Sequence, residues 1–215
     1  MVNNNGSRRV RTSALTRGEI AAAALRMFAE EGLTGLSMRR LGSELGVHYS
    51  TLYWHISDKR ELLRLVLDAV LADVPAPSPG AAWQTSLAEL FSGLRTALRR
   101  HPGAAVLVLE LGMPGPNATA FARGARDLLA GVGLDERRAE WAYRTLMQYT
   151  AASVQEESAS PWSGVDRLAG VDDRAMRLAA VPAPREPDRA AAAADAEAQF
   201  GYGLDCLLRG ISTTA

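Results

Sequence analysis

Apolar residues recur along most of this 215-residue chain at the spacing of an amphipathic helix. The first such face starts at Ile20 and ends near Gly32. Thr16 lies just before this helix, and Glu19 follows three residues later. This is the spacing of a capping box, in which each side chain accepts a backbone N–H at the helix start. No run of alternating β-branched residues is present, so the pattern predicts an all-α fold without a sheet.

Three more helices are predicted before residue 75. Ser37 is the expected cap of the second helix, and Gly46 is its expected end. A third, short helix covers residues 49–55. Asp58 is the expected cap of a fourth, which covers residues 59–72. These elements predict a small helical unit at the start of the chain.

A proline-rich segment, residues 75–81, is predicted to link two domains. Residues 1–13 are expected to form a flexible basic arm, residues 14–74 a helix-turn-helix domain, and residues 82–215 a larger helical domain. In that larger domain we expect helices over residues 83–101, 104–111, 117–130, 135–157 and 192–210. Asn117 and Asp135 are the expected caps of the third and fourth of these. The helix over residues 104–111 is almost wholly apolar and is expected to be buried, and residues 158–190 are expected to form a loose loop.

The charge distribution also divides the chain, after residue 64 and close to the predicted linker. The chain has 24 basic and 24 acidic residues in all, but residues 1–64 hold ten basic and six acidic ones, a net charge of +4. The remaining residues hold fourteen and eighteen, a net charge of −4. A basic first domain favours contact with a polyanion. The single cysteine, Cys206, excludes an internal disulfide, and no apolar stretch is long enough to span a membrane, so we expect a cytoplasmic protein.

The most informative segment is residues 37–63, where two short helices flank a tight turn at Gly46-Val47. Leu41, Leu45 and Leu52 can form a small core that sets the angle between these helices. The second helix then presents hydroxyl and aromatic groups, which can contact phosphates, base edges and thymine methyls in the major groove. These residues are His48, Tyr49, Ser50, Thr51, Tyr53 and Trp54.

This segment resembles the DNA-binding domain of the TetR (tetracycline-repressor) family. The signature of that family is carried by Gly46-Val47, Leu52-Tyr53, His55-Ile56, Lys59 and Leu62. The resemblance implies that the DNA-contacting positions are Arg39, Tyr49, Ser50, Thr51, Tyr53, Trp54, His55 and Lys59, with Lys59 facing a phosphate at a helix start. Two alternatives stay open. Tyr53 and Trp54 could be core aromatics, and His55 is either a phosphate ligand or a structural histidine.

The rest of the chain resembles, more weakly, the C-terminal domain of the tetracycline-repressor class. The resemblance is carried by Trp83-Gln84, Arg100-His101-Pro102, Gly115-Pro116-Asn117 and residues 202–211. It implies a homodimer, in which the helices over residues 135–157 and 192–210 of each subunit form a four-helix bundle. Small residues on both segments suit such close packing.

One departure from the tetracycline-binding members concerns their metal-chelate site. Val108 stands at the position of one chelate-binding histidine and Pro75 at the position of another. The resemblance therefore implies no metal, no cofactor and a ligand other than tetracycline. We expect a small, mostly apolar or aromatic effector, although each lining residue could instead be ordinary core. The expected contacts are Phe91, Leu94, Val108, Met113, Asn117, Phe121, Trp141, Tyr143, Met147 and Gln148.

The resemblance implies a transcriptional repressor that is released from a palindromic operator by its effector, while the residues themselves do not distinguish a repressor from an activator. An enzyme is disfavoured, because the sequence has no metalloprotease, Walker, nucleophile-elbow or paired-cysteine motif and only three histidines. A DNA binder without sequence preference would be strongly basic, which a net charge of zero contradicts. A dimeric binding protein that has lost DNA binding is disfavoured, because the second helix of the motif, over residues 49–55, is an intact recognition helix.

Overall fold

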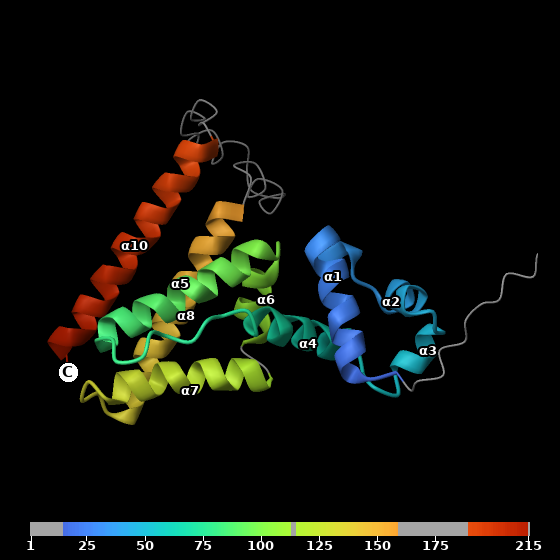
Figure 1. Ribbon diagram of the computed structural model, residues 1–215, viewed down its shortest axis with the longest axis horizontal. Coiled ribbons are helices and arrows are strands. Elements are labelled where there is room, and N and C mark those ends of the chain that lie inside the picture. Colours follow the sequence, from blue (N-terminus) through green and yellow to red (C-terminus); the bar gives the residue numbers. More distant parts are fainter. Residues whose placement is uncertain (1–14, 113–114, 159–188, 215) are drawn as a thin grey trace, which may run out of the picture.

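Helix starts in the first domain form where the sequence predicts them. The computed structural model describes residues 15–112, 115–158 and 189–214, and this part of the chain contains helices and no strand (Figure 1). α1 (Arg17–Gly35) starts at Thr16, whose hydroxyl accepts the Glu19 N–H at 3.2 Å while the Glu19 carboxylate accepts the Thr16 N–H at 2.9 Å. The capping box is thus confirmed. At Gly32 (φ 65°) the helix kinks rather than ends, because the chain resumes helical geometry for one further turn.

The next helices are α2 (Met38–Leu45), α3 (Tyr49–Leu52) and α4 (Lys59–Leu71). The predicted caps are confirmed, because the Ser37 hydroxyl accepts the Arg40 N–H at 3.3 Å and the Asp58 carboxylate accepts the Glu61 N–H at 2.7 Å. α3 is shorter than predicted. After Leu52 the chain continues in tighter turns, in which backbone N–H groups donate to the carbonyl three residues earlier.

The second domain contains α5 (Trp83–Arg100), α6 (Ala104–Leu111), α7 (Pro116–Ala130), α8 (Glu136–Ser158) and α10 (Arg189–Thr214). Two predictions are wrong here. Asn117 is not the cap of α7 but lies within its first turn, because Gly115 occupies the cap position. α6 is not wholly buried, because only one face packs against α4 and α8 and the Leu109 side chain is 46% exposed. The loop expected between α8 and α10 lies outside the described residues.

α4 is the connection between the two domains. It packs against α1 on one side and against α6 and α7 on the other, as its central place in Figure 1 shows. Fully buried apolar side chains of α4, such as Val66 and Leu67, belong to the same core as Phe91 and Leu94 of α5. α4 therefore connects the packing of α6 and α7 to that of the first domain.

A buried arginine joins three helices of the second domain. Arg95 of α5 is only 2% exposed, and its guanidinium forms an ion pair with Glu157 of α8 at 2.8 Å and another with Glu197 of α10. The same guanidinium lies 4.8 Å from the centre of the Phe200 ring. A buried cation without a partner is costly, so these contacts define where α10 lies against α5 and α8.

Candidate DNA-binding surface and effector cavity

The turn between α2 and α3 sets the angle of α3, the recognition helix of the predicted helix-turn-helix. Gly46 has left-handed geometry (φ 69°, ψ 26°), which favours glycine, and the Val47 N–H donates to the Gly42 carbonyl at 2.9 Å. A Cβ on Gly42 would lie 3.0 Å from the backbone of Val47 and Tyr49. The two helices can therefore approach closely only with glycine at position 42, which the sequence analysis did not identify.

Aromatic side chains of this segment lie on the surface and not in the core. Trp54 is 87% exposed and Tyr53 is 49% exposed, whereas Leu52 and Ile56 are fully buried. Tyr49 is also exposed, at the start of α3. Core packing of Tyr53 and Trp54, the alternative that the sequence left open, is excluded because Leu52 and Ile56 fill the apolar side.

His48 has a local role that the sequence did not predict. It is the N-cap of α3, and its Nδ1 accepts the Ser50 N–H at 3.4 Å and lies 2.7 Å from the Ser50 hydroxyl. Its ring also lies 4.4 Å from the ring of Tyr49. Thr51 follows on the same short helix and is half-buried. His48 thus positions the start of α3, where Tyr49, Ser50 and Thr51 are presented.

Several cations around this helix have no acidic partner. Arg17, Arg26 and Arg40 form ion pairs with Glu61, Glu44 and Glu31. Within the described part of the chain, in contrast, Arg39, Lys59 and Arg60 form no ion pair, and Arg39 lies 5.9 Å from the centre of the Tyr49 ring. Lys59 is exposed at the first residue of α4. These cations are available to phosphates.

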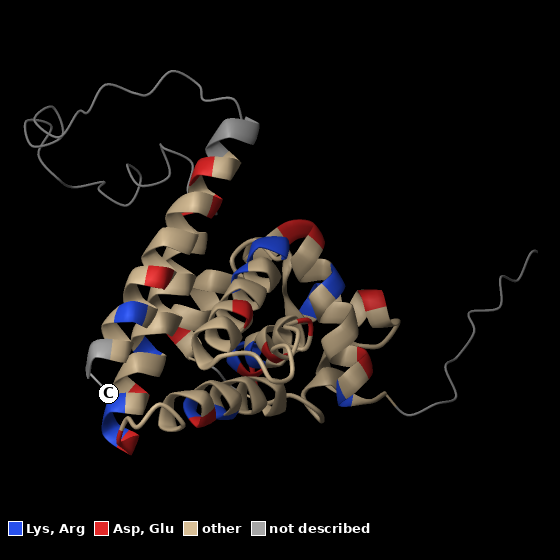
Figure 2. Cartoon of the chain, turned by 60° about the vertical axis from the view of Figure 1, so that its left-hand side comes forward, with Lys and Arg blue, Asp and Glu red and all other residues tan. Residues whose placement is uncertain are grey.

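The positive charge of the first domain is smaller than the whole sequence indicates. Residues 15–64 hold seven basic and six acidic residues, a net charge of +1, so three of the ten basic residues counted above lie in residues 1–14. Figure 2 shows acidic and basic positions interspersed along the helices. Within the described residues, the positive charge open to a polyanion therefore comes from a few unpaired cations.

Glu61 holds α4 against the start of α1 and the turn after α3. Its carboxylate accepts the N–H and the hydroxyl of Ser57, both at 2.7 Å, and the Arg17 guanidinium at 2.5 Å. These donors, with the Ser57 N–H as the largest contribution, lower the pKa of Glu61 from 4.5 to about 2. Arg17 also donates to the His55 carbonyl at 2.7 Å. The His55 side chain is half-buried, so both readings of its role stay open.

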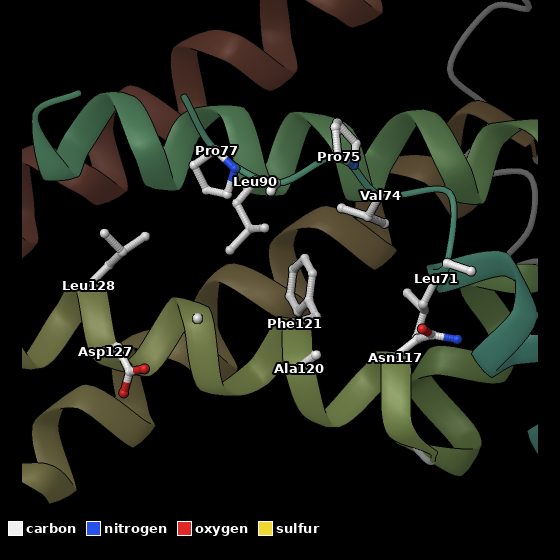
Figure 3. Close-up of a pocket in the computed structure, with 13 residues that line it drawn as sticks. Leu71, Val74, Pro75, Pro77, Leu90, Asn117, Ala120, Phe121, Asp127 and Leu128 are labelled. Atoms are coloured by element: carbon white, nitrogen blue, oxygen red, sulfur yellow. The ribbon is translucent and has the colours of Figure 1, made fainter. Parts of the chain in front are cut away.

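A cavity of about 580 Å³ lies between α7, α5 and the segment that follows α4 (Figure 3). Its walls are mostly apolar, with Asn117 and Asp127 as the polar residues. This volume and character are typical of a small-molecule site. The lining residues are Leu71, Ala72, Val74, Pro75, Ala76, Pro77, Leu90, Asn117, Ala120, Phe121, Gly124, Asp127 and Leu128.

Only two of the predicted effector contacts, Asn117 and Phe121, line this cavity. Phe91, Leu94 and Val108 are buried in the core behind it, where Phe91 meets Phe121 edge-on at 5.5 Å. Tyr143 and Met147 are also buried, and the guanidinium of Arg126 lies 4.4 Å from the centre of the Tyr143 ring. Trp141 and Gln148 lie on an exposed face of α8, away from the cavity, and Met113 lies outside the described residues.

The sequence analysis missed the wall that residues 71–77 form. This segment is docked on α5: a Cβ on Gly93 would lie 2.9 Å from the Pro75 ring, and the Ser78 N–H donates to the Glu89 carboxylate at 2.6 Å. The small residues Ala120 and Gly124, one helical turn apart on α7, leave space opposite it. That spacing of small residues beside Phe121 was the available sequence signal.

A second hollow, of about 610 Å³, lies on the outer face of α8 and α10. It is lined by apolar residues of both helices, including Leu146 and Leu207, and the Trp141 side chain there is 54% exposed. Cys206 and Ile211 also contribute to it. This apolar groove lies on the two segments that the sequence predicts to form the dimer bundle.

Neither a metal-binding cluster nor a membrane-spanning helix is present in residues 15–112, 115–158 and 189–214. Within these ranges, no group of three or more histidine, cysteine, aspartate or glutamate side chains could hold a metal ion. No described helix is long and apolar enough to cross a membrane. Val108 is buried on the packed face of α6 and cannot chelate a metal.

Comparison with known families matches both parts of the chain. Residues 20–66 match the family described as bacterial regulatory proteins, tetR family, and residues 76–215 match the tetracyclin repressor-like C-terminal domain. An HTH-type transcriptional regulator of Saccharopolyspora erythraea is 33% identical over 209 residues, which are 94% of this chain and 86% of that one.

Two further relatives differ in the ligand that their names give. The class D tetracycline repressor protein of Escherichia coli is 29% identical over 199 residues, which are 91% of this chain and 88% of that one. The crystal structure of ActR, a TetR family protein of Streptomyces coelicolor in complex with (S)-DNPA, matches with a TM-score of 0.74 and 30% identity. That match covers 94% of this chain and all of the other.

Proposed function

Because the chain belongs to the TetR family of DNA-binding transcriptional regulators, we propose that it represses from a palindromic operator and is released by a small, mostly apolar ligand in the cavity of α5 and α7. One observation carries the proposal. α4 ends at Leu71, and the wall of the cavity between Leu71 and Pro77 continues directly from it, so a ligand that moves this wall also moves the end of α4. No enzymatic step is involved.

On the DNA side, Tyr49, Ser50, Thr51, Tyr53 and Trp54 are proposed to face the major groove. Arg39, Lys59 and His55 are proposed to contact the flanking phosphates, while His48 orders the start of the helix. Two recognition helices of a dimer must lie about one DNA turn apart, roughly 34–36 Å, to enter successive major grooves. A tilt of α4 changes this separation and weakens both contacts at once.

The ligand is proposed to be chemically unlike a magnesium–tetracycline chelate. Val108 is buried where the chelating members need a metal ligand, and the cavity offers one neutral amide and one carboxylate among apolar walls. ActR, a relative with a similar fold, binds (S)-DNPA, which shows that ligands other than tetracyclines occur among the relatives. Release requires that the ligand bind the DNA-free conformation more tightly than the DNA-bound one.

The test begins with genomic DNA fragments that the full-length protein retains. The retained duplex is then titrated with apolar and aromatic compounds, with and without magnesium, while operator binding is followed by fluorescence anisotropy. We expect release by at least one such compound at equal efficiency with and without magnesium. Retention of no specific duplex would refute the DNA-binding proposal, and release by magnesium–tetracycline alone would refute the proposed ligand class.

The homodimer is proposed to form through α8 and α10, which carry the apolar groove around Trp141. Trp141→Glu places a charge in that groove, so we expect a monomer in sedimentation at micromolar concentration, together with loss of operator binding. Leu109→Glu is the matched control, because Leu109 is an exposed apolar residue on α6, outside the groove. A dimeric Trp141→Glu protein would contradict this interface.

A further inference from the structure

We propose that Asp68 is a positioning residue that transmits the state of the effector cavity to the DNA-binding domain, by holding the first turn of α7 against α4. This inference rests on the proposed function and specifies how it is regulated. Asp68 is a buried carboxylate in α4, only 8% exposed, in the helix that leads directly from the recognition helix to the cavity.

All polar partners of Asp68 within the described ranges belong to the first turn of α7. Its Oδ1 accepts the Ala118 N–H at 3.0 Å, and its Oδ2 accepts the Asn117 side-chain amide at 3.1 Å. The same amide donates to the Asp68 backbone carbonyl, also at 3.1 Å. No described cation forms an ion pair with Asp68. The charge of a buried carboxylate is therefore satisfied by α7 alone.

α7 needs this contact because it has no cap of its own. Gly115 occupies the cap position with φ 103° and has no side chain, and Pro116 has no N–H to donate. A Cβ on Gly115 would lie 2.4 Å from the Asp68 carboxylate, so the approach of the two helices depends on this glycine. Asp68 thus acts as the N-cap of a helix 47 residues further along the chain, and its negative charge stabilises the helix dipole.

The same contact forms one end of the cavity. Asn117 is a lining residue, and Leu71 lines the cavity one turn after Asp68 on α4. Figure 3 shows Asn117 beside Leu71 at this end, with Phe121 one turn further along α7. A ligand that displaces Asn117 or the first turn of α7 removes hydrogen bonds from a buried carboxylate. We expect α4 to move in response, because the Asp68 carboxylate then lacks its partners in α7.

Directional bonds distinguish this contact from the contact between α4 and α6. The packing of α4 against α6 is largely apolar, and apolar surfaces can slide over each other at small cost. Hydrogen bonds to a carboxylate depend on distance and angle, so the cap has two discrete states, made and broken. Coupling between the cavity and the DNA-binding surface requires an element with two states whose equilibrium both sites shift.

Asp68→Asn tests the inference, because it keeps the shape of the side chain and removes the charge that attracts α7. The measurement is amide hydrogen exchange of the first turns of α7 in the full-length dimer, with and without the duplex that the wild-type protein retains. In the wild-type protein we expect the duplex to slow exchange at residues 118–121 at least fivefold. In Asp68→Asn we expect less than a twofold change, together with operator binding at least tenfold weaker.

Asp135→Asn is the matched control. Asp135 caps α8 by accepting the Arg138 N–H at 2.8 Å, but it does not contact α4. We expect it to lower the melting temperature without changing the response of α7 to the duplex. If the wild-type α7 does not respond to the duplex, or if Asp68→Asn retains the full response, the inference is wrong. Either result would refute the role of Asp68 but would leave DNA binding and release by ligand in place, so the two proposals are tested independently.

Discussion

The DNA-binding surface and the effector cavity differ in how the chain builds them. The surface is made by residues 39–59, a single short segment on closely spaced helices, and its aromatic and cationic side chains point outward. The cavity is made by residues that lie up to 57 positions apart, from Leu71 to Leu128, and its walls point inward. A surface site can be assigned from local sequence, whereas a cavity depends on how distant helices pack.

The two sites also differ in what holds them. The recognition helix is positioned by directional contacts: the His48 cap, the left-handed turn at Gly46, and the Glu61 carboxylate with its donors from Ser57 and Arg17. The cavity is bounded by prolines, small residues and apolar side chains. Directional contacts favour one rigid geometry, while apolar walls accept ligands of varied shape. A regulator needs both properties in different places.

The largest effect is expected at the DNA-binding surface. Tyr53→Ala and Lys59→Ala should each weaken operator binding about a hundredfold or more, because each change is repeated in both subunits and contacts of this kind are worth about 1–3 kcal/mol. Lys59→Ala should also lower the salt dependence of binding by about one unit per subunit. Changes at Tyr49 or Thr51 should instead alter sequence preference. Fluorescence anisotropy across salt concentrations measures these effects.

Arg123→Ala is the control for charge, since Arg123 is an exposed arginine of α7 outside the DNA-binding surface. It should leave operator binding within about twofold. If Lys59→Ala binds the operator normally at every salt concentration, the phosphate contact proposed for Lys59 is wrong.

An intermediate effect is expected at the cavity. Gly124 lines it, and a Cβ added there would meet nothing within 4 Å. Gly124→Leu should therefore fill the cavity and weaken ligand binding at least tenfold, while the loss of a helical glycine stabilises the protein by about 0.5–1 kcal/mol. Operator binding should persist but no longer respond to the ligand. Calorimetry should show the weaker ligand binding, and thermal unfolding should show the higher stability.

Arg123→Leu is the matched control for Gly124→Leu, because it adds a leucine to the neighbouring exposed position of α7 outside the cavity. It should leave ligand affinity unchanged. A Gly124→Leu protein that still responds fully to the ligand would show that the effector binds elsewhere.

The smallest effect concerns pH. His101 lies at the junction of the two domains, with its ring 6.4 Å from that of Phe28 in α1, and its Nδ1 finds no hydrogen-bond partner among the described residues. Burial lowers the pKa of His101 below its ordinary value of 6.5. The unfolded chain then binds more protons, so stability should fall as pH drops through 6.5. His101→Phe should flatten this dependence in melting curves between pH 8 and 5.

Glu61, in the first domain, loses its contribution to stability at a lower pH than His101 does. Because its pKa is about 2, its contribution to stability is complete above pH 4.5 and is lost only as pH falls from 4.5 toward 2. Acid should therefore weaken the junction of the domains before it weakens the recognition helix. Equal pH dependence of the wild-type protein and His101→Phe above pH 5 would contradict this order.

The sequence by itself determined the helix starts of the first domain and the segment that carries its aromatic and cationic side chains. The capping box at Thr16, the caps at Ser37 and Asp58, and the left-handed turn at Gly46 depend on residues a few positions apart, so local hydrogen bonds and backbone sterics decide them. The exposure of Tyr53 and Trp54 was left open by the sequence, and the structure decides it, because Leu52 and Ile56 fill the apolar side of the same turn.

Only the tertiary structure decided where the cavity lies and what caps α7. Periodicity shows that a helix has an apolar face but not which neighbour covers it, so Phe91 and Leu94 could not be separated from true lining residues. For the same reason Trp141 was expected in the cavity and lies in the outer groove. The cap of α7 comes from Asp68, 47 positions before Gly115. Contacts over such separations follow from the packing of whole helices, which no local pattern records.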